Sequence, residues 1–183
     1  VAADVEVQPE DVAACLYTSG TTGRPKGALL THDNLIFDAH SVIEHIAVKD
    51  AENYLCVLPL FHSFGQTVCM LVPIFSGASI TLIEQFRPDT VLKEVAEKGV
   101  TIFAGVPAMY GAFLGAIKKI KGYDLSSLKL CFSGGAPMPV EIMKAFEEEY
   151  PITIIMVHSN AVFMVRAEMR HFSLIFSCTC GAR

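Results

Sequence analysis

The sequence predicts an α/β domain in which a mostly parallel sheet is flanked by helices. Short apolar runs rich in β-branched residues alternate with segments of helical periodicity, which is typical of this class. The 183 residues are 52% hydrophobic and 18% charged, so the chain has enough apolar material for one folded core. The first apolar run ends in a polar, glycine-rich loop, and we find no internal repeat.

The first half of the chain is expected to hold three strands and one helix. The apolar run at 12–17 predicts a buried strand, and Thr31 or Asp33 is expected near the start of the helix that follows. Pro59 begins an aromatic loop after the second strand. The predicted ranges are 12–17, 54–58 and 78–83 for the strands and 33–48 for the helix.

The second half alternates strands with helices that open at a proline. Pro88 occupies a first helical position and Gly99 lies just past the expected end of that helix, where these two residue types are favoured. Further helices are expected to begin at Pro107 and Pro139. The strands of this half are predicted over 101–104, 128–132 and 152–157.

Composition excludes several classes of protein. The formal net charge of −5 argues against binding to a nucleic-acid backbone, which needs a basic surface. The longest apolar stretch, 67–83, is broken by Pro73, Ser76 and Gly77, so no transmembrane segment is predicted. Six cysteines without C-x-x-C spacing favour reduced thiols and a cytoplasmic protein.

The most informative segment is 17–27, Tyr-Thr-Ser-Gly-Thr-Thr-Gly-Arg-Pro-Lys-Gly. Glycines let successive backbone N–H groups converge on an anion, and Lys26 adds a mobile positive charge, so this composition predicts a phosphate-binding loop. An ordinary flexible loop is the alternative. A P-loop phosphotransferase is disfavoured, because Pro25 precedes Lys26 and Gly27 follows it, unlike the Walker pattern.

This segment resembles the phosphate loop of the adenylate-forming superfamily. Residues 58–65, Leu-Pro-Leu-Phe-His-Ser-Phe-Gly, resemble its second core motif, and 105–107 and 133–137 resemble its later pocket-forming stretches. The resemblance covers about residues 10–156 and is greatest to medium- or long-chain fatty acyl-CoA ligases. It implies part of the large N-terminal domain of such an enzyme, with ATP, Mg²⁺, coenzyme A and a carboxylic acid as small-molecule partners. It implies no oligomeric state.

The resemblance also implies roles for individual residues. His62 would lie beside the reacting carboxylate as a catalytic residue together with Lys26, although a half-buried histidine bonded to a backbone carbonyl is the alternative. The β- and γ-phosphates, bridged by Mg²⁺, would be held by Thr18, Ser19, Gly20, Thr21, Thr22, Gly23 and Lys26. The adenine and acyl pockets would be formed by Gly134, Gly135, Ala136, Pro137, Val106 and Pro107, with Met109, Tyr110 and the aromatic residues near His62 as further candidates. For these apolar side chains core packing is the alternative. No cluster with metal-ligand spacing is found, so the metal would be held through ATP.

The last 27 residues depart from the family pattern. Where the family continues with a Glu-Gly-Tyr-Gly-x-Thr-Glu type of segment, residues 157–163 read Val-His-Ser-Asn-Ala-Val-Phe. Residues 157–183 carry three Arg and one Glu, whereas 1–156 carry 11 basic and 18 acidic side chains. We expect a partial adenylate-forming domain over 1–156 and a foreign tail over 157–183; a chance bias in a short segment is the alternative. The function implied is ATP-dependent activation of a fatty acid to acyl-CoA, and the alternative is a catalytically silent chain that at most binds ATP or AMP.

Overall fold

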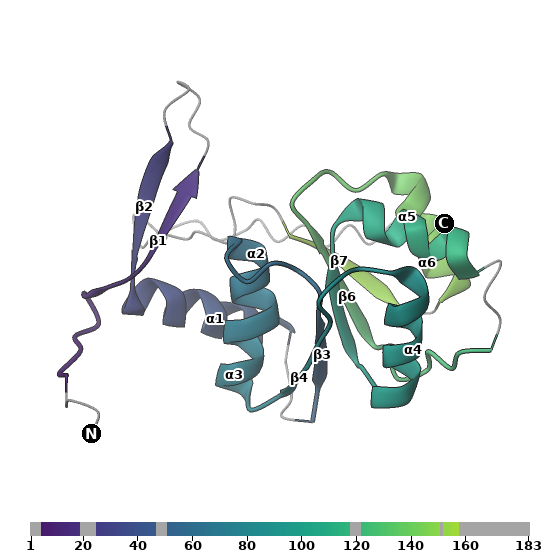
Figure 1. Cartoon of the computed structure of the whole chain (residues 1–183), viewed down its shortest axis with the longest axis horizontal. Coiled ribbons are helices and arrows are strands. Elements are labelled where there is room, and N and C mark those ends of the chain that lie inside the picture. The colour runs from purple at the N-terminus through teal and green to yellow at the C-terminus, as the bar shows by residue number, and fades with distance from the viewer. Residues whose placement is uncertain (1–4, 19–24, 47–50, 118–121, 151, 158–183) are drawn as a thin grey trace.

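A computed structural model describes residues 5–18, 25–46, 51–117, 122–150 and 152–157. A parallel five-stranded sheet in the order β4-β3-β5-β6-β7 forms its centre (Figure 1). This confirms the predicted fold class. The strands are β3 (Asn53–Cys56), β4 (Ser79–Leu82), β5 (Ile102–Gly105), β6 (Leu130–Gly134) and β7 (Thr153–Val157).

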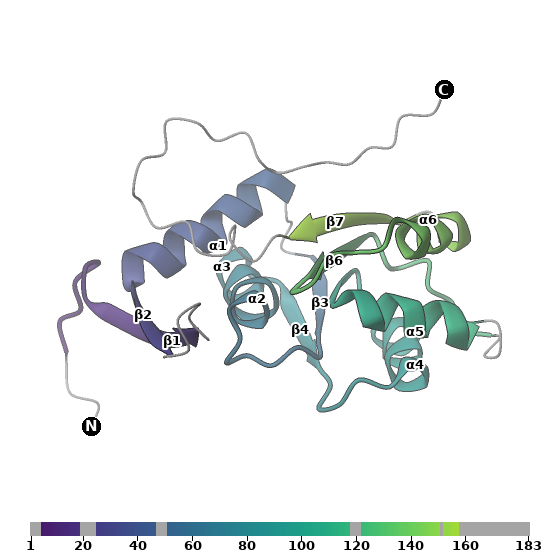
Figure 2. The same ribbon diagram turned by 90° about the horizontal axis from the view of Figure 1, so that it is seen from above.

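Helices cover both faces of this sheet (Figure 2). One face carries α4 (Pro88–Lys98), α5 (Pro107–Ile117) and α6 (Val140–Glu149). The other carries α1 (His32–Ile46) and the consecutive turns α2 (Ser63–Gln66), η1 (Thr67–Leu71) and α3 (Val72–Ser76).

Neighbouring strand residues serve the two faces in alternation. Leu55 and Phe103 pack under α4–α6, whereas Tyr54, Ile102 and Ala104 pack under the helices of the opposite face. This period of two is a property of extended backbone. It explains why the central strands are apolar runs rather than alternating polar and apolar residues, because both of their faces are buried.

The helix predicted from Pro88 and Gly99 is confirmed. Pro88 is the first residue of α4, and Gly99 ends the helix with a left-handed φ of 61°. Its apolar face is buried through Val91, Leu92 and Val95. The start of α1 is confirmed as well, since the Thr31 hydroxyl accepts from the amide of Asn34 at 3.2 Å. Such a side-chain cap satisfies an otherwise unpaired amide of the first turn.

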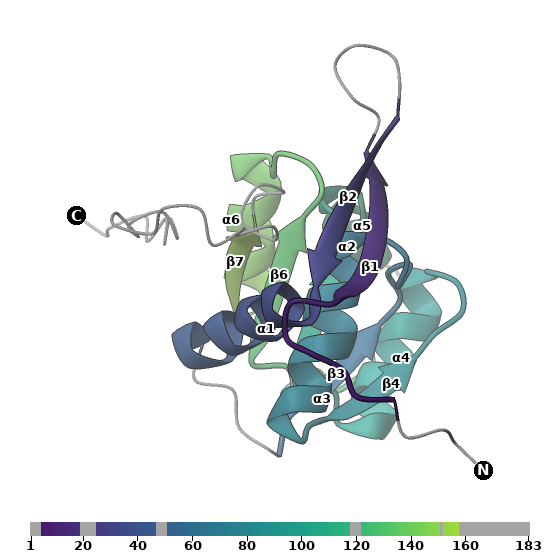
Figure 3. The same ribbon diagram turned by 90° about the vertical axis from the view of Figure 1, so that its left-hand side faces the viewer.

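A strand does form where one is predicted at 12–17, but the prediction that it is buried is wrong. Strand β1 (Val12–Thr18) pairs antiparallel with β2 (Lys26–Thr31) in a separate hairpin, and β2 leads directly into α1 (Figures 1 and 3). Val12 and Tyr17 are 56% and 77% exposed. The run has strand-forming residues, but a two-stranded ribbon has only one neighbour for each strand and leaves much of its surface in solvent.

The region after His62 is more helical than predicted. The aromatic loop and apolar stretch expected there form the α2–η1–α3 run. Pro73 lies directly after the η1 turn, in the first turn of α3, and because proline has no N–H the helical hydrogen-bond pattern is interrupted at this point of the run. Gly77 ends the run at a φ of 71°. In the part of the chain that the structure describes, no helix has the length and apolar character needed to cross a membrane.

Candidate active site at the carboxyl edge of the sheet

Three of the predicted motifs follow strands of the parallel sheet directly. His62 lies in the segment after β3, Val106 comes directly after β5, and Gly135 directly after β6. Because the strands are parallel, all three segments leave from the same edge. The carboxyl edge of such a sheet is where α/β proteins usually bind ligands.

The His62 ring has a defined hydrogen bond. His62 is the N-cap of α2 with extended backbone (φ −97°, ψ 135°), and its Nδ1 accepts from the amide of Phe64 at 3.3 Å. A neutral imidazole that accepts at Nδ1 carries its proton on Nε2. The residue is exposed. The alternative of a half-buried histidine bonded to a carbonyl is therefore wrong, and with Nδ1 used as the acceptor the ring N–H is on Nε2.

The turn that carries His62 is tightly packed. The amide of His62 donates to the Pro59 carbonyl at 3.1 Å. A Cβ atom added to Gly65 would lie 2.5 Å from that carbonyl oxygen, a distance that side chains do not adopt. Only glycine therefore allows α2 to lie this close to the turn after β3.

The stretch 134–137 is divided into one buried and three exposed residues. Gly134 is buried, and a Cβ atom on it would lie 3.1 Å from two ring carbons of Phe64 and from the Val157 carbonyl. The absence of a side chain at 134 thus serves packing within the protein. Gly135, with a left-handed φ of 79°, Ala136 and Pro137 are exposed at the carboxyl edge, where a ligand can approach the backbone.

The candidate acyl-pocket residues also differ in burial. Val106 is half-buried, and a Cβ atom on Gly135 would lie 3.5 Å from its Cγ1, so the ends of β5 and β6 are adjacent. Pro107 is buried at the start of α5. Tyr110 is fully buried, and its hydroxyl donates to the Phe132 carbonyl at 2.7 Å. The suggestion that Tyr110 lines an acyl pocket is wrong, because its ring and hydroxyl are both used in the core.

The described part of the phosphate loop comprises its two ends. Thr18 and Lys26 are register partners at the end of the β1–β2 hairpin, and Lys26 is exposed. The pairing brings the first and last predicted phosphate-binding residues together. The other predicted phosphate-binding residues lie outside the described residues: Ser19, Gly20, Thr21, Thr22 and Gly23.

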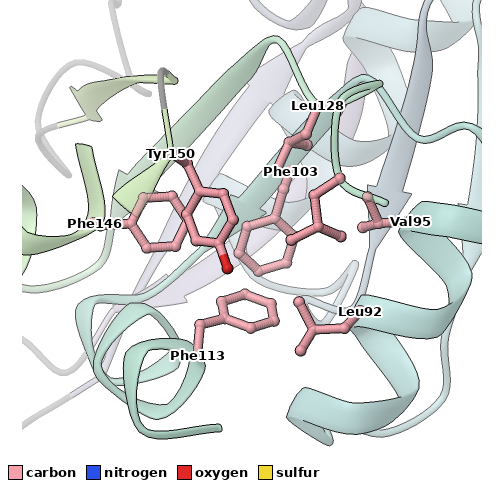
Figure 4. Close-up of a pocket in the computed structure, with 8 residues that line it drawn as sticks. Leu92, Val95, Phe103, Phe113, Leu128, Phe146 and Tyr150 are labelled. Carbon is pink, nitrogen blue, oxygen red and sulfur yellow. The ribbon is translucent and has the colours of Figure 1, made fainter. Parts of the chain in front are cut away.

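A small apolar cavity lies away from this edge, between the sheet and the helices α4–α6 (Figure 4). Its volume is about 10 Å³, close to the space of one water molecule and far below that of an acyl chain. Tyr150 contributes a hydroxyl whose pKa burial raises to about 12, with Glu149 adding to the rise. The lining residues are Leu92, Val95, Phe103, Phe113, Leu125, Leu128, Phe146 and Tyr150. The cavity is a packing defect rather than a substrate pocket.

No set of three or more His, Cys, Asp or Glu side chains within the described ranges is placed to hold a metal ion. The described cysteines, Cys15, Cys56, Cys69 and Cys131, are free thiols.

Comparison with known proteins assigns the family. The AMP-binding enzyme family matches residues 1–159. The chain belongs to this family. It is 38% identical over 143 residues to a feruloyl-CoA synthase of Amycolatopsis sp., which covers 78% of this chain and 29% of that protein. It is equally identical over 146 residues to a long-chain-fatty-acid–CoA ligase of Bacillus subtilis, covering 78% and 26%.

The fold of this AMP-binding family member also matches solved structures. ATP-bound MatB from Rhodopseudomonas palustris superposes with a TM-score of 0.77 at 29% identity, over 86% of this chain and 31% of that one. The chain thus spans between a quarter and a third of the length of these three proteins. The likeness extends over the carboxyl edge described above, which lies inside the matched residues.

Two residues of this site are not predicted as such by the sequence. The sequence indicates Phe64 only as an aromatic residue near a pocket, and Gly65 only as part of a motif. Their spacing from His62 was visible, but the contacts that give them a role reach Gly134 and Pro59. Of these, the contact with Gly134 is remote in sequence and carries no local signal.

Proposed function

We propose that the chain is part of an AMP-forming acid–thiol ligase that activates a carboxylic acid with ATP and transfers it to coenzyme A. The carboxylate attacks the α-phosphorus and releases pyrophosphate, and the thiol of coenzyme A then displaces AMP. The observation that carries the proposal is the Nε2–H of His62 at the same sheet edge as the exposed backbone of Gly135–Pro137. Membership of the AMP-binding family supports it.

Each part of the edge has a chemical task under this proposal. A neutral Nε2–H donor can hold an oxygen of the reacting carboxylate without neutralising it as a nucleophile. The exposed backbone after β6 would receive the adenine, and Thr18, Lys26 and the loop between them would hold the β- and γ-phosphates. Mg²⁺ would reach the site bound to those phosphates, because it prefers oxygen ligands. Catalysis would then rest on positioning and on charge neutralisation at the departing pyrophosphate.

We propose a medium- or long-chain fatty acid as the substrate. The amino-acid sequence of the His62 motif and the likeness to a fatty-acid–CoA ligase support this choice. The likeness to a feruloyl-CoA synthase makes an aromatic acid the competing substrate. Burial of an apolar acyl chain beside Val106 and Pro107 discriminates only weakly between acids of different chain length, since one methylene is worth about 1–3 kcal/mol.

The test is acid-dependent exchange of pyrophosphate into ATP, measured with octanoate, palmitate and ferulate. We expect exchange with the fatty acids, and its loss in Lys26→Ala. Lys144→Ala, an exposed lysine on α6, is the matched control and should leave exchange unchanged. Exchange that survives Lys26→Ala would contradict the role of the loop.

The second candidate function is nucleotide binding without turnover. It is favoured by residues 157–163, whose sequence departs from the Glu-Gly-Tyr-Gly-x-Thr-Glu type of segment with which the family continues. Calorimetric titration with Mg-ATP separates the two functions. Heat of binding without pyrophosphate exchange supports the silent chain. The absence of both heat and exchange would contradict both functions.

The domain division and the cytoplasmic location stay predictions. Val157, the first residue of the predicted tail, is the last residue of β7 and pairs with Gly134. Residues 158–183 lie outside the described residues. Translation of the flanking nucleotides in all three frames tests whether the tail is foreign, and one uninterrupted frame in several independent copies would contradict that view.

A further inference from the structure

Phe64 makes two contacts that belong to different parts of the candidate site. Its amide donates to Nδ1 of His62 at 3.3 Å. The residue is 3% exposed, and a Cβ atom added to Gly134 would lie 3.1 Å from two carbons of its ring. One residue therefore contacts both the proposed carboxylate donor and the start of the proposed adenine stretch.

The surroundings leave this residue little freedom. At Gly65 the backbone of α2 lies so close to the Pro59 carbonyl that no side chain fits between them. The amide of Gln66 donates to the His62 carbonyl at 2.9 Å. On the other side, Gly134 is held between the Phe64 ring and the Val157 carbonyl. Because packed interiors transmit small displacements rather than absorb them, movement of the ring must move either the helix start or the end of β6.

We propose that Phe64 is a positioning residue that fixes the His62 tautomer through its amide and the Gly134–Gly135 backbone through its ring. The proposal rests on the function proposed above. Under this proposal Phe64 sets the distance between the acid-binding and nucleotide-binding parts of the site. It also explains why a side chain at residue 134 would be tightly packed, since its Cβ would lie 3.1 Å from the Phe64 ring and from the Val157 carbonyl.

Phe64→Leu tests the proposal with a readout that overall stability does not move. Nitrogen-15 NMR of the histidine rings at pH 8, where an ordinary imidazole is neutral, reports the tautomer. His62→Gln identifies the His62 signals. In the unchanged protein we expect a bare Nδ1 and a protonated Nε2. Leucine keeps the backbone amide but loses the ring that packs α2 against Gly134, so the amide is no longer held in place. In Phe64→Leu we therefore expect shifts averaged between both tautomers and faster amide exchange at Gly134 and Gly135.

Phe113→Leu is the matched control. Phe113 is 4% exposed and belongs to the core cluster on the opposite face of the sheet, so the substitution removes a similar buried area. It should leave the His62 tautomer unchanged. An unchanged tautomer and unchanged exchange in Phe64→Leu would overturn the proposal, and so would equal changes in both variants.

A second variant approaches the contact from the other side. The methyl group of Gly134→Ala would lie 3.1 Å from the Phe64 ring and from the Val157 carbonyl. We expect the ring to shift, so this variant should show the same averaged tautomer. It decides the matter by the same readouts if Phe64→Leu does not fold. Titration with Mg-ATP is scored separately, and we expect weaker binding in Phe64→Leu because the Gly134–Gly135 backbone is no longer held in place. If the unchanged protein does not bind Mg-ATP, the proposed function fails, while the NMR result still decides the role of Phe64.

Discussion

A buried carboxylate on α1 shows how one residue can set a pH dependence. Asp38 is 8% exposed, and the Thr67 hydroxyl donates to its Oδ2 at 2.9 Å. Burial raises the pKa of Asp38 from its ordinary 3.8 to about 6, although the hydrogen bond from Thr67 lowers it. The desolvation of the charge thus outweighs one hydrogen bond.

The folded state therefore binds more protons at Asp38 than the unfolded chain does between pH 3.8 and about 6. The free energy of unfolding that this residue contributes falls as pH rises through that window, by about 3 kcal/mol in total. We expect Asp38→Asn to gain stability relative to the unchanged protein from pH 4 to pH 7. Urea unfolding at both pH values measures this gain, and Asp89→Asn, an exposed residue of α4, controls for removal of one carboxylate. A constant difference between the two proteins at both pH values would contradict the expectation.

At the scale of single elements, two glycines in neighbouring helices should respond oppositely to the same change. Gly99 ends α4 at a φ of 61°, whereas Gly115 lies within α5 with open space where a Cβ would stand. We expect Gly99→Ala to destabilise the protein by about 1 kcal/mol, the cost of a left-handed L-residue. Gly115→Ala should stabilise it by roughly 0.5–1 kcal/mol, since alanine loses less backbone entropy in a helix. Thermal unfolding of both variants checks this. If both substitutions change the free energy of unfolding in the same direction, the assigned end of α4 is wrong.

Element identity was more predictable from the sequence than element partners. Pro88 and Gly99 mark the ends of α4 because their backbone preferences are local. The pairing of β1 with β2 depends on contacts across the hairpin, and Lys26–Thr31 has no distinct strand pattern. The η1 turn has no local sequence signal for a related reason, since the irregular helix is held by packing on α1, including the Thr67–Asp38 hydrogen bond.

At the scale of the whole molecule, the candidate site was predictable as a set of motifs but not as a set of contacts. The parallel sheet brings the segments after β3, β5 and β6 to one edge, which follows from the predicted topology alone. The division of roles at that edge does not follow from it. Gly134 is buried by Phe64 and Gly135 is not, although the two glycines are adjacent and look equivalent in the sequence.

The two parts of the fold should also differ in local stability. The β1–β2 hairpin exposes Val12, Tyr17 and Leu29, while β5 and β6 are inner strands with apolar cover on both faces. Local opening is least costly where few apolar contacts are lost. We expect amides of 12–18 and 26–31 to exchange with deuterium before those of 102–105 and 130–134.

Mg-ATP should change this order selectively if the hairpin end and the carboxyl edge form one site. A ligand that binds only the closed form slows exchange by its binding free energy. We expect slower exchange at Thr18, Lys26 and 62–66, while 91–98 on α4, which packs on the face away from the His62 segment, exchanges as before. Exchange measured by mass spectrometry with and without nucleotide checks this, with Mg²⁺ alone as the control. Protection confined to α4, or equal throughout the chain, would separate nucleotide binding from the edge to which we assign it.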